Sequence, residues 1–262
     1  EQLAKKLNEL NDERKRLTEQ VFQEAEERIL QNPVALEKSR LIFEGDSNWP
    51  AGVLGIVAGR LMEKYHRPVV LYQNKKHVNT GSARSIKGFD LAKAFHSIKS
   101  SLVSGGGHAQ AAGLSFRDDY IKEVGQKLKE QAEKALTPDM LVPRIRIDSE
   151  IIPADVDWNT YDLINKLAPF GIGNPTPVFV LKSSLIQNLK LVGKDRTHLQ
   201  ITLKPEDQLG IPVSFRGIGF GLGYLAEELY ENTLVDTVFK LDVNEWGDKR
   251  ELQLQIIDMK KA

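Results

Sequence analysis

The proline-containing stretch TPDMLVPR, residues 137–144, separates two parts of the chain that differ in hydrophobic periodicity. Before it, short apolar runs such as PVVLY alternate with segments whose apolar residues recur every three to four positions. After it, five segments alternate apolar and polar residues, as half-buried strands do. This pattern predicts two domains, one of helices packed on a sheet and one built mainly from strands.

The two patterns set the expected domain boundaries. We expect an α/β domain over residues 34–138, with strands alternating with helices, and a β-rich domain with its lead-in segment over residues 139–262. Residues 1–33 form a separate element, because apolar residues recur at helical spacing among charged ones until Asn32-Pro33. This predicts one long amphipathic helix that connects domains; a short dimerising coiled coil is the alternative.

The strand-like segments of the second domain come in a recognisable order. Three strands are followed by a helix over residues 224–231 and then by two more strands, which is the order of an OB-type barrel. Barrels of this type commonly bind single-stranded nucleic acid on a curved face. The order alone fits a structural role equally well, because a fold does not fix a function.

Charge is distributed unevenly along a chain whose formal net charge is zero. Residues 60–117 contain ten Lys or Arg against two acidic residues, a balance of +8, and four of the five histidines. Residues 141–262 contain 14 basic and 17 acidic residues, a balance of −3. We therefore expect an anionic ligand at the first domain.

Composition excludes several classes of protein. The chain has no cysteine, which excludes disulfides, zinc-thiolate sites and cysteine nucleophiles. It has no run of about 18 apolar residues, and its charged N-terminus lacks the apolar core of a secretory signal. We expect a cytoplasmic protein without a membrane segment, and a piece of a longer chain, since it begins inside a helical pattern without Met.

The stretch SGGGHAQAAG, residues 104–113, is the first candidate phosphate site. Glycine lets a ligand approach the backbone N–H groups closely, and a helix that follows adds its partial positive charge. We expect Gly105, Gly106 and Gly107 to direct amides at a phosphate, with Ser104 and His108 as hydrogen-bond donors and a short helix after them. A tight strand-to-helix turn with a capping histidine is the alternative.

The stretch TGSARSIKG, residues 80–88, is the second candidate. Arg84 can bind a phosphate with two parallel hydrogen bonds, and Ser82 and Ser85 can add hydroxyl donors. Such residues are common in surface turns, so the pattern gains weight from the positive segment around it.

Metal ligands are scarce in the same region. Between residues 44 and 117 the acidic residues are Glu44, Asp46, Glu63 and Asp90, and they form no convincing set for two metal ions. The sequence therefore predicts a chain that binds phosphate without cutting a phosphodiester alone.

These motifs resemble a known family. GDSNWPAGVLGIVAGRLMEKYHRPVVLY, the GSARS turn and SGGGHAQAAGLSF are similar to the DHH-associated domain of the DHH phosphoesterases, and LAPFGIGNPTPVF is similar to the entry into the OB domain of RecJ-type exonucleases. The resemblance covers essentially the whole chain. It identifies the chain as the C-terminal part of a RecJ-type, single-strand-specific DNA exonuclease of recombination and repair.

The resemblance implies roles that the residues alone do not. Two manganese or magnesium ions are expected in an upstream DHH catalytic domain, and no metal or cofactor is expected in this chain. Arg84 and Ser85 would hold DNA phosphate, Gly105 to His108 would hold the nucleotide near the scissile bond, and His108 would support catalysis by stabilising developing charge. Single-stranded DNA would be degraded from 5′ to 3′.

The OB-type domain has a candidate path for the strand. Lys190, Lys194, Arg196 and Arg216 are the basic residues we select, with His198 beside them and Phe215 or Phe220 as stacking partners. The alternative is a domain that mainly packs against the rest of the protein or contacts repair proteins. For the whole chain, the alternatives are a non-catalytic nucleic-acid or nucleotide binding module, the associated domain of an oligonucleotide phosphodiesterase and a protein-binding regulator.

Overall fold

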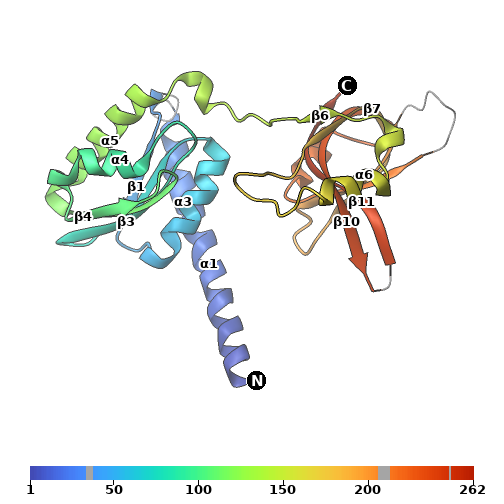
Figure 1. Ribbon diagram of the computed structural model, residues 1–262. Helices are drawn as coiled ribbons and strands as arrows, with labels where there is room; N and C mark the ends of the chain where they lie inside the picture. Colours follow the sequence, from blue (N-terminus) through green and yellow to red (C-terminus); the bar gives the residue numbers. More distant parts are fainter. Residues whose placement is uncertain (34–37, 206–212, 248) are drawn as a thin grey trace. The chain divides into compact units, whose positions relative to one another are not determined.

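The protein folds into two compact units, Glu1–Arg144 and Ile145–Ala262. The computed structural model describes residues 1–33, 38–205, 213–247 and 249–262 (Figure 1). Each unit has its own hydrophobic core, and no residue of the second core belongs to the first unit. The chain passes from the first unit to the second at the end of the 137–144 stretch, where the periodicity of the sequence changes.

The first unit is built on a mixed sheet of five strands. The strand order is β1-β2-β3-β5-β4, in which β1 and β2 are parallel and every other pair is antiparallel. The strands are β1 (Ile42–Asp46), β2 (Val69–Gln73), β3 (Val78–Arg84), β4 (Ser104–Gly107) and β5 (Ala111–Arg117).

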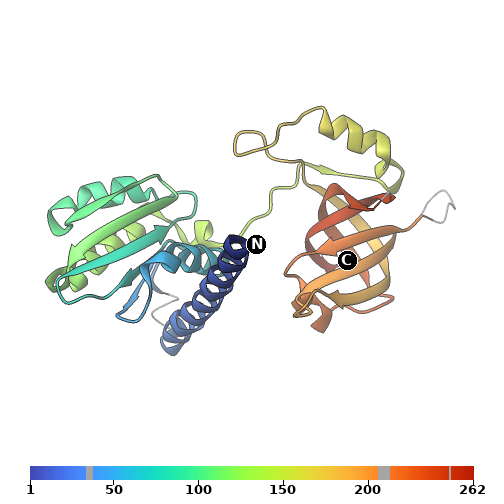
Figure 2. The ribbon, with the colours of Figure 1, turned by 90° about the horizontal axis from the view of Figure 1, so that it is seen from below.

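Helices cover the two faces of this sheet unequally (Figures 1 and 2). On one face, α4 (Leu91–Ser97) and α5 (Ile121–Ala135) pack against the β3, β5 and β2 side chains in a core that contains Phe116. On the other face, α1 (Gln2–Gln31) and α3 (Ala51–Tyr65) bury the residues of β1 and β2. The predicted α/β architecture is confirmed.

The long N-terminal helix is also confirmed, and its C-terminal half is fixed to the unit. Arg28 forms an ion pair with Asp46 and donates to the Gly45 carbonyl at 2.9 Å, and the Trp49 indole N–H donates to Glu24 at 2.8 Å. The N–H of Asn48 and the Arg28 guanidinium hold the pKa of Asp46 below its usual value. These contacts join α1 to the start of α3 through the loop after β1.

The N-terminal half of α1 extends away from the unit (Figure 1). Its buried residues begin at Thr18, whereas Leu3, Leu7 and Leu10 are 58–79% exposed. Within the described residues, no helix is both long enough and apolar enough to cross a membrane.

The second unit is a ring of five strands with a lead-in segment. Antiparallel pairing of β10 with β7 closes the ring β7-β8-β9-β11-β10, and β9 and β11 pair in parallel (Figure 2). The short strand β6 (Ser149–Glu150) and α6 (Trp158–Asn165) precede it. The ring strands are β7 (Phe179–Val192), β8 (His198–Pro205), β9 (Phe215–Gly219), β10 (Leu234–Trp246) and β11 (Lys249–Lys261).

The strand order agrees with the predicted OB-type domain, and a helix lies between the third and fourth strands, but it is shorter than the expected residues 224–231. It is a 3-10 helix, Gly223–Glu227. The Gly223 N–H donates to the Thr197 carbonyl at 2.9 Å, which fixes the start of this helix, and both Leu225 and Leu229 turn into the core. The Leu229 N–H donates to the Leu225 carbonyl at 2.8 Å, and the chain leaves the helical conformation after this turn. Part of the expected third strand, residues 210–212, lies outside the described residues.

The three-glycine stretch is an edge strand, and the expected short helix after it is wrong. β4 pairs with β5 as a hairpin, and the His108 N–H donates to the Ala111 carbonyl at 2.8 Å to close the turn. Residues 111 and 112, which we expected in a helix, begin β5. The hairpin forms because β5 provides a full set of backbone partners for glycines that have little helix propensity of their own.

Each glycine of β4 has a different neighbourhood. A Cβ on Gly105 would lie 2.8 Å from the Leu102 side chain. A Cβ on Gly106 would meet nothing within 4 Å. Gly107 has φ +142°, and a Cβ there would lie 2.5 Å from the Ala111 carbonyl oxygen. Gly107 is therefore the position at which the backbone itself requires glycine.

Two substitutions test whether the cores are separate. Phe116→Ala removes a fully buried ring from the first unit and Phe239→Ala removes one from the second, each at a cost of about 3–5 kcal/mol. Hydrogen exchange measured by mass spectrometry should show faster exchange only in residues 38–144 for the first variant and only in residues 145–262 for the second. Equal acceleration in both units by either variant would contradict the separation.

The neighbouring glycines make a matched pair for the hairpin. Gly107→Ala should lower the free energy of unfolding of the first unit by about 2–4 kcal/mol, because a side chain there meets both a positive φ and the backbone. Gly106→Ala should change it by less than about 0.5 kcal/mol. Urea unfolding followed by circular dichroism measures both, and a comparable loss in the two variants would contradict the register of the hairpin.

Candidate nucleic-acid interface

Part of one face of the first unit's sheet, on β5 and β4, is left uncovered by the helices, and α3 packs against β3 at the border of this area. We call it the open face. We define it by three rows of outward residues that the register of β3, β5 and β4 aligns; a further row, Val78–Arg117, lies on the same face beyond them. In the three rows the side chains are small, hydroxylated or absent, and the one charged group among them is an arginine. The rows are Thr80–Ser115–Ser104, Ser82–Gly113–Gly106 and Arg84–Ala111.

The open face brings together the two stretches that the sequence marked as phosphate sites. Arg84 and Ser82 lie on β3, and Ser104 and Gly106 lie on β4, with β5 between them. The separation is therefore two strand spacings, about 10 Å. Ser104 and Gly106 are exposed, whereas Ser82 and Arg84 are half-buried.

The arginine of the open face is oriented but not neutralised. Its Nη1 donates to the Ala83 carbonyl at 2.9 Å and to the Ser82 hydroxyl at 3.3 Å. Among the described residues, no carboxylate forms an ion pair with it. Gly55 of α3 lies beside it, because a Cβ on that glycine would be 3.0 Å from Arg84 Nη2 and from Ser82 Oγ. Such a guanidinium can bind an anionic oxygen without first breaking an ion pair.

The glycine strand adds backbone donors. β4 is the last strand of its sheet, so alternate N–H and C=O groups on its outer side have no strand partner. Without Cβ atoms, these N–H groups are open to a phosphate oxygen. His108 is exposed at the start of the turn that follows, beside the pair Ala111 and Arg84 in the next two strands.

Ser85 is placed differently from the other predicted residues. Its side chain is only 4% exposed, and its hydroxyl donates to the Phe89 carbonyl at 2.7 Å. Its N–H donates to the Gln110 carbonyl at 3.0 Å, which joins the end of β3 to the start of β5. These bonds commit Ser85 to holding the turn after β3.

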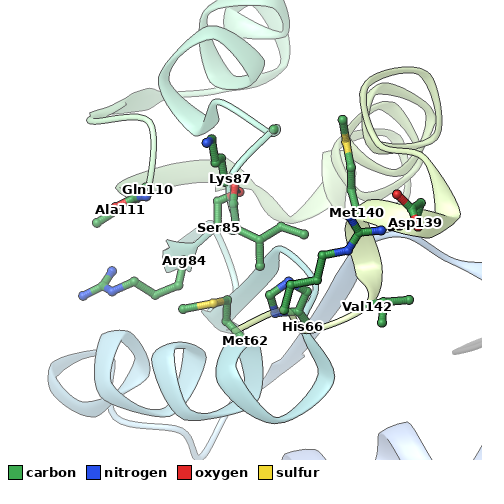
Figure 3. Close-up of a pocket in the computed structure, with 13 residues that line it drawn as sticks. Met62, His66, Arg84, Ser85, Lys87, Gln110, Ala111, Asp139, Met140 and Val142 are labelled. Carbon is green, nitrogen blue, oxygen red and sulfur yellow. Dashed lines mark hydrogen bonds and ion pairs between the residues drawn. The ribbon is translucent and has the colours of Figure 1, made fainter. Parts of the chain in front are cut away.

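A cavity beside the open face contains residues that sequence reasoning missed. Its volume is about 1060 Å³. Met62 comes from α3 and His66 from the position that caps its C-terminus, Ser85 and Lys87 lie in the turn after β3, and Met140 and Val142 lie in the segment after α5 (Figure 3). The lining also includes Arg84, Ile86, Gly88, Gln110, Ala111, Asp139 and Arg144.

The signal for this cavity was present in the sequence of α3. Gly52, Gly55, Gly59 and Met62 recur at helical spacing and so share one side of α3, and His66 caps its C-terminus. Gly55 adjoins Arg84, and Met62 and His66 line the cavity. Glycines carry no hydrophobic or charged signal, so a search for apolar or charged periodicity does not find this stripe.

The predicted strand path of the second unit is partly assembled. Lys190 of β7 pairs with Gln200 of β8, and Arg216 of β9 pairs with Thr202 of β8. Since residues 200 and 202 lie on the same side of β8, Lys190 and Arg216 share the outer face of the sheet. Arg216 also forms an ion pair with Glu251 at 2.7 Å, which offsets its charge.

The other residues of that path lie around one end of the ring. Lys194 and Arg196 are exposed in the turn between β7 and β8. Phe220 is 60% exposed and contacts the edge of the His198 ring, with the ring centroids 5.5 Å apart. Phe215 packs against the core instead, so Phe220 is the aromatic side chain that is free to stack on a base.

Neither unit offers a metal centre among the residues that the structure describes. No group of three or more His, Asp or Glu side chains lies close enough together to hold an ion there. The described side chains therefore do not fit the manganese or magnesium ions that the family resemblance implies, and no hydrolytic step can be assigned to them.

Both units match family models. The DHHA1 domain model matches residues 35–137, and the RecJ OB domain model matches residues 147–258.

Curated relatives match along nearly the whole chain. The single-stranded-DNA-specific exonuclease RecJ of Escherichia coli is 31% identical over 266 residues, 98% of this chain and 44% of its own length. The RecJ of Bacillus subtilis is 28% identical over 260 residues, 98% of this chain and 32% of its own length. The chain thus spans a third to under half of the length of these relatives, in their C-terminal part.

A solved structure gives the same assignment. The crystal structure of Thermus thermophilus RecJ in complex with Mn²⁺ superposes with a TM-score of 0.72 and 25% identity, covering 99% of this chain and 36% of that one. A RecJ structure from the same organism contains Mg²⁺. With its DHHA1 and OB domains in this order, the chain belongs to the RecJ family, of which it matches the C-terminal part.

Proposed function

We propose that this chain is the substrate-binding part of a metal-dependent, single-strand-specific DNA exonuclease that acts from 5′ to 3′ in recombination and repair. The open face would hold DNA phosphates while an upstream DHH catalytic domain supplies the metal ions and the hydrolysis. Arg84 carries this proposal, because it is an oriented guanidinium with no carboxylate partner among the described residues.

The residues of the open face have different roles in the proposal. Arg84 binds a phosphate through its guanidinium, with Ser82 holding it in place and facing the same ligand. Those backbone N–H groups of Gly105 to Gly107 that face outward from the sheet edge bind a neighbouring phosphate. Ser104 adds a hydroxyl to the same phosphate. His108 stabilises negative charge that develops near the scissile bond.

The second unit would guide the incoming strand. Its outer face carries Lys190 and Arg216, its β7–β8 turn carries Lys194 and Arg196, and Phe220 offers a stacking surface. Repair proteins would bind the same unit through its lead-in segment, where Leu163, Leu167 and Ile172 are 52–105% exposed. In this proposal the exonuclease acts in the cytoplasm.

Phosphate binding is tested with Arg84→Ala and a charge-matched control. For a 5′-phosphorylated single-stranded oligothymidylate, Arg84→Ala should weaken binding about tenfold, the value of a charge-assisted hydrogen bond. The slope of log affinity against log salt should fall by about 0.7. Lys134→Ala removes one charge from the exposed end of α5 and should leave the affinity unchanged.

Fluorescence anisotropy over a salt series, without metal, measures both quantities. Equal affinities for the wild type, Arg84→Ala and Lys134→Ala would contradict phosphate binding at the open face. His108→Ala belongs in the same series, as it removes an exposed side chain of the hairpin without changing β4.

Complementation tests the division of labour. A separately expressed DHH catalytic domain of a relative, mixed with this chain and Mn²⁺, should digest single-stranded DNA, and Arg84→Ala should reduce the rate at subsaturating DNA. Release of nucleotides from end-labelled DNA is the readout. If the two parts form a complex by analytical ultracentrifugation but no digestion follows, the chain is a binding module rather than the partner of a nuclease.

A further inference from the structure

We propose that the cavity beside the open face binds one nucleobase of the strand whose phosphate Arg84 holds. This inference rests on the proposed function and goes beyond it, since contacts to phosphate do not involve the base. The observation behind it is a large, largely apolar cavity that shares Arg84 and Ala111 with the open face.

The size of the cavity suits a nucleotide. At about 1060 Å³ it lies at the upper end of the range for small-molecule sites, about 300–1,000 Å³. One base with its sugar fits inside such a volume and leaves the phosphate at the mouth. Arg84 lies at that mouth, because it belongs to both the cavity lining and the open face.

Apolar side chains from more than one segment line the walls of the cavity. Met62 from α3 and Met140 from the segment after α5 present thioether side chains, and Ile86 and Val142 extend the apolar surface. The Met140 sulfur also lies against the turn, 3.3 Å from the position of a Cβ on Gly88. Methionine side chains are flexible and polarisable, and they make favourable contacts with aromatic rings.

The charges around the cavity favour an anionic ligand. Lys87, His66 and Arg84 line it, and among the described residues neither Lys87 nor Arg84 forms an ion pair. Asp139 is the one acidic residue of the lining, and it is paired with Arg144. An apolar interior with unpaired cations at its rim matches a nucleotide, which joins an aromatic base to a phosphate.

The path from phosphate to base is continuous along α3. Gly55 lies beside Arg84, and Gly59 has nothing within 4 Å of a Cβ position. Met62 follows on the same side of the helix, His66 caps the helix C-terminus, and both line the cavity. The helix thus offers a smooth surface that leads from the guanidinium to the methionine wall.

An abasic scan tests the pocket. The probes are a 5′-phosphorylated oligothymidylate and a set in which each nucleotide in turn lacks its base, and anisotropy gives the affinities. For the wild type, one abasic position should weaken binding about fivefold to tenfold, the effect of losing one buried apolar group. The other positions should change it much less.

Two methionine variants test whether the loss of affinity at the abasic position arises in the cavity. In Met140→Ala and in Met62→Ala the intact oligonucleotide should bind as weakly as the abasic probe does to the wild type, and the abasic penalty should disappear. Leu30→Ala, which removes an apolar side chain that is 56% exposed elsewhere in the unit, should behave as the wild type. Met140 is 45% exposed, so its variant retains the fold even if Met62→Ala does not.

The outcomes separate this inference from the proposed function. If no abasic position weakens binding more than the others, the base pocket is contradicted. It is also contradicted if the loss of affinity at one abasic position is the same in Met140→Ala as in the wild type. In both cases the effect of Arg84→Ala on the intact oligonucleotide is still seen. Loss of the Arg84→Ala effect itself overturns both proposals.

Discussion

The arrangement of this protein depends on the unequal cover of one β-sheet. Helices α4 and α5 pack across one face, whereas α1 and α3 bury mainly β1 and β2 on the other. The remaining part of that face, on β5 and β4 and along the border of β3, is open to solvent. Large apolar side chains there would be exposed, and most positions are occupied by Ser, Thr, Gly and Ala, with Arg84 at one end and the pair Val78 and Arg117 at the other.

The same constraint explains the electrostatics of the first unit. Positive charge is concentrated in residues 60–117, yet several of its cations form ion pairs, such as Arg60 with Glu19. Arg84 forms no ion pair with an acidic residue of the described chain, since its partners in the sheet are Val69 and Ala111 and α3 presents Gly55 to it. Its charge is available because the surface around it is made of small residues.

The sequence predicted the classes of element well and the candidate site less well. Helical spacing placed α1 correctly, and alternation of apolar and polar residues indicated the five strands of the ring in the second unit. The glycine stretch was assigned to a loop and a helix because three glycines carry no periodicity, and β4 becomes a strand only through its long-range pairing with β5. Ser85 resembled a surface hydroxyl in the sequence, and its burial follows from a bond to Phe89.

The sequence by itself determined the two-part organisation, the position of the positive segment and the residue types that can bind phosphate. These follow from periodicity and composition, which are local properties of the chain. Only the tertiary structure decided which of those residues meet. Arg84 and the glycine strand become neighbours through the register of β3, β5 and β4, and Met62 joins Met140 across a cavity because helix packing places α3 beside the segment after α5. Register and packing depend on contacts between residues far apart in the chain, and no local pattern records them.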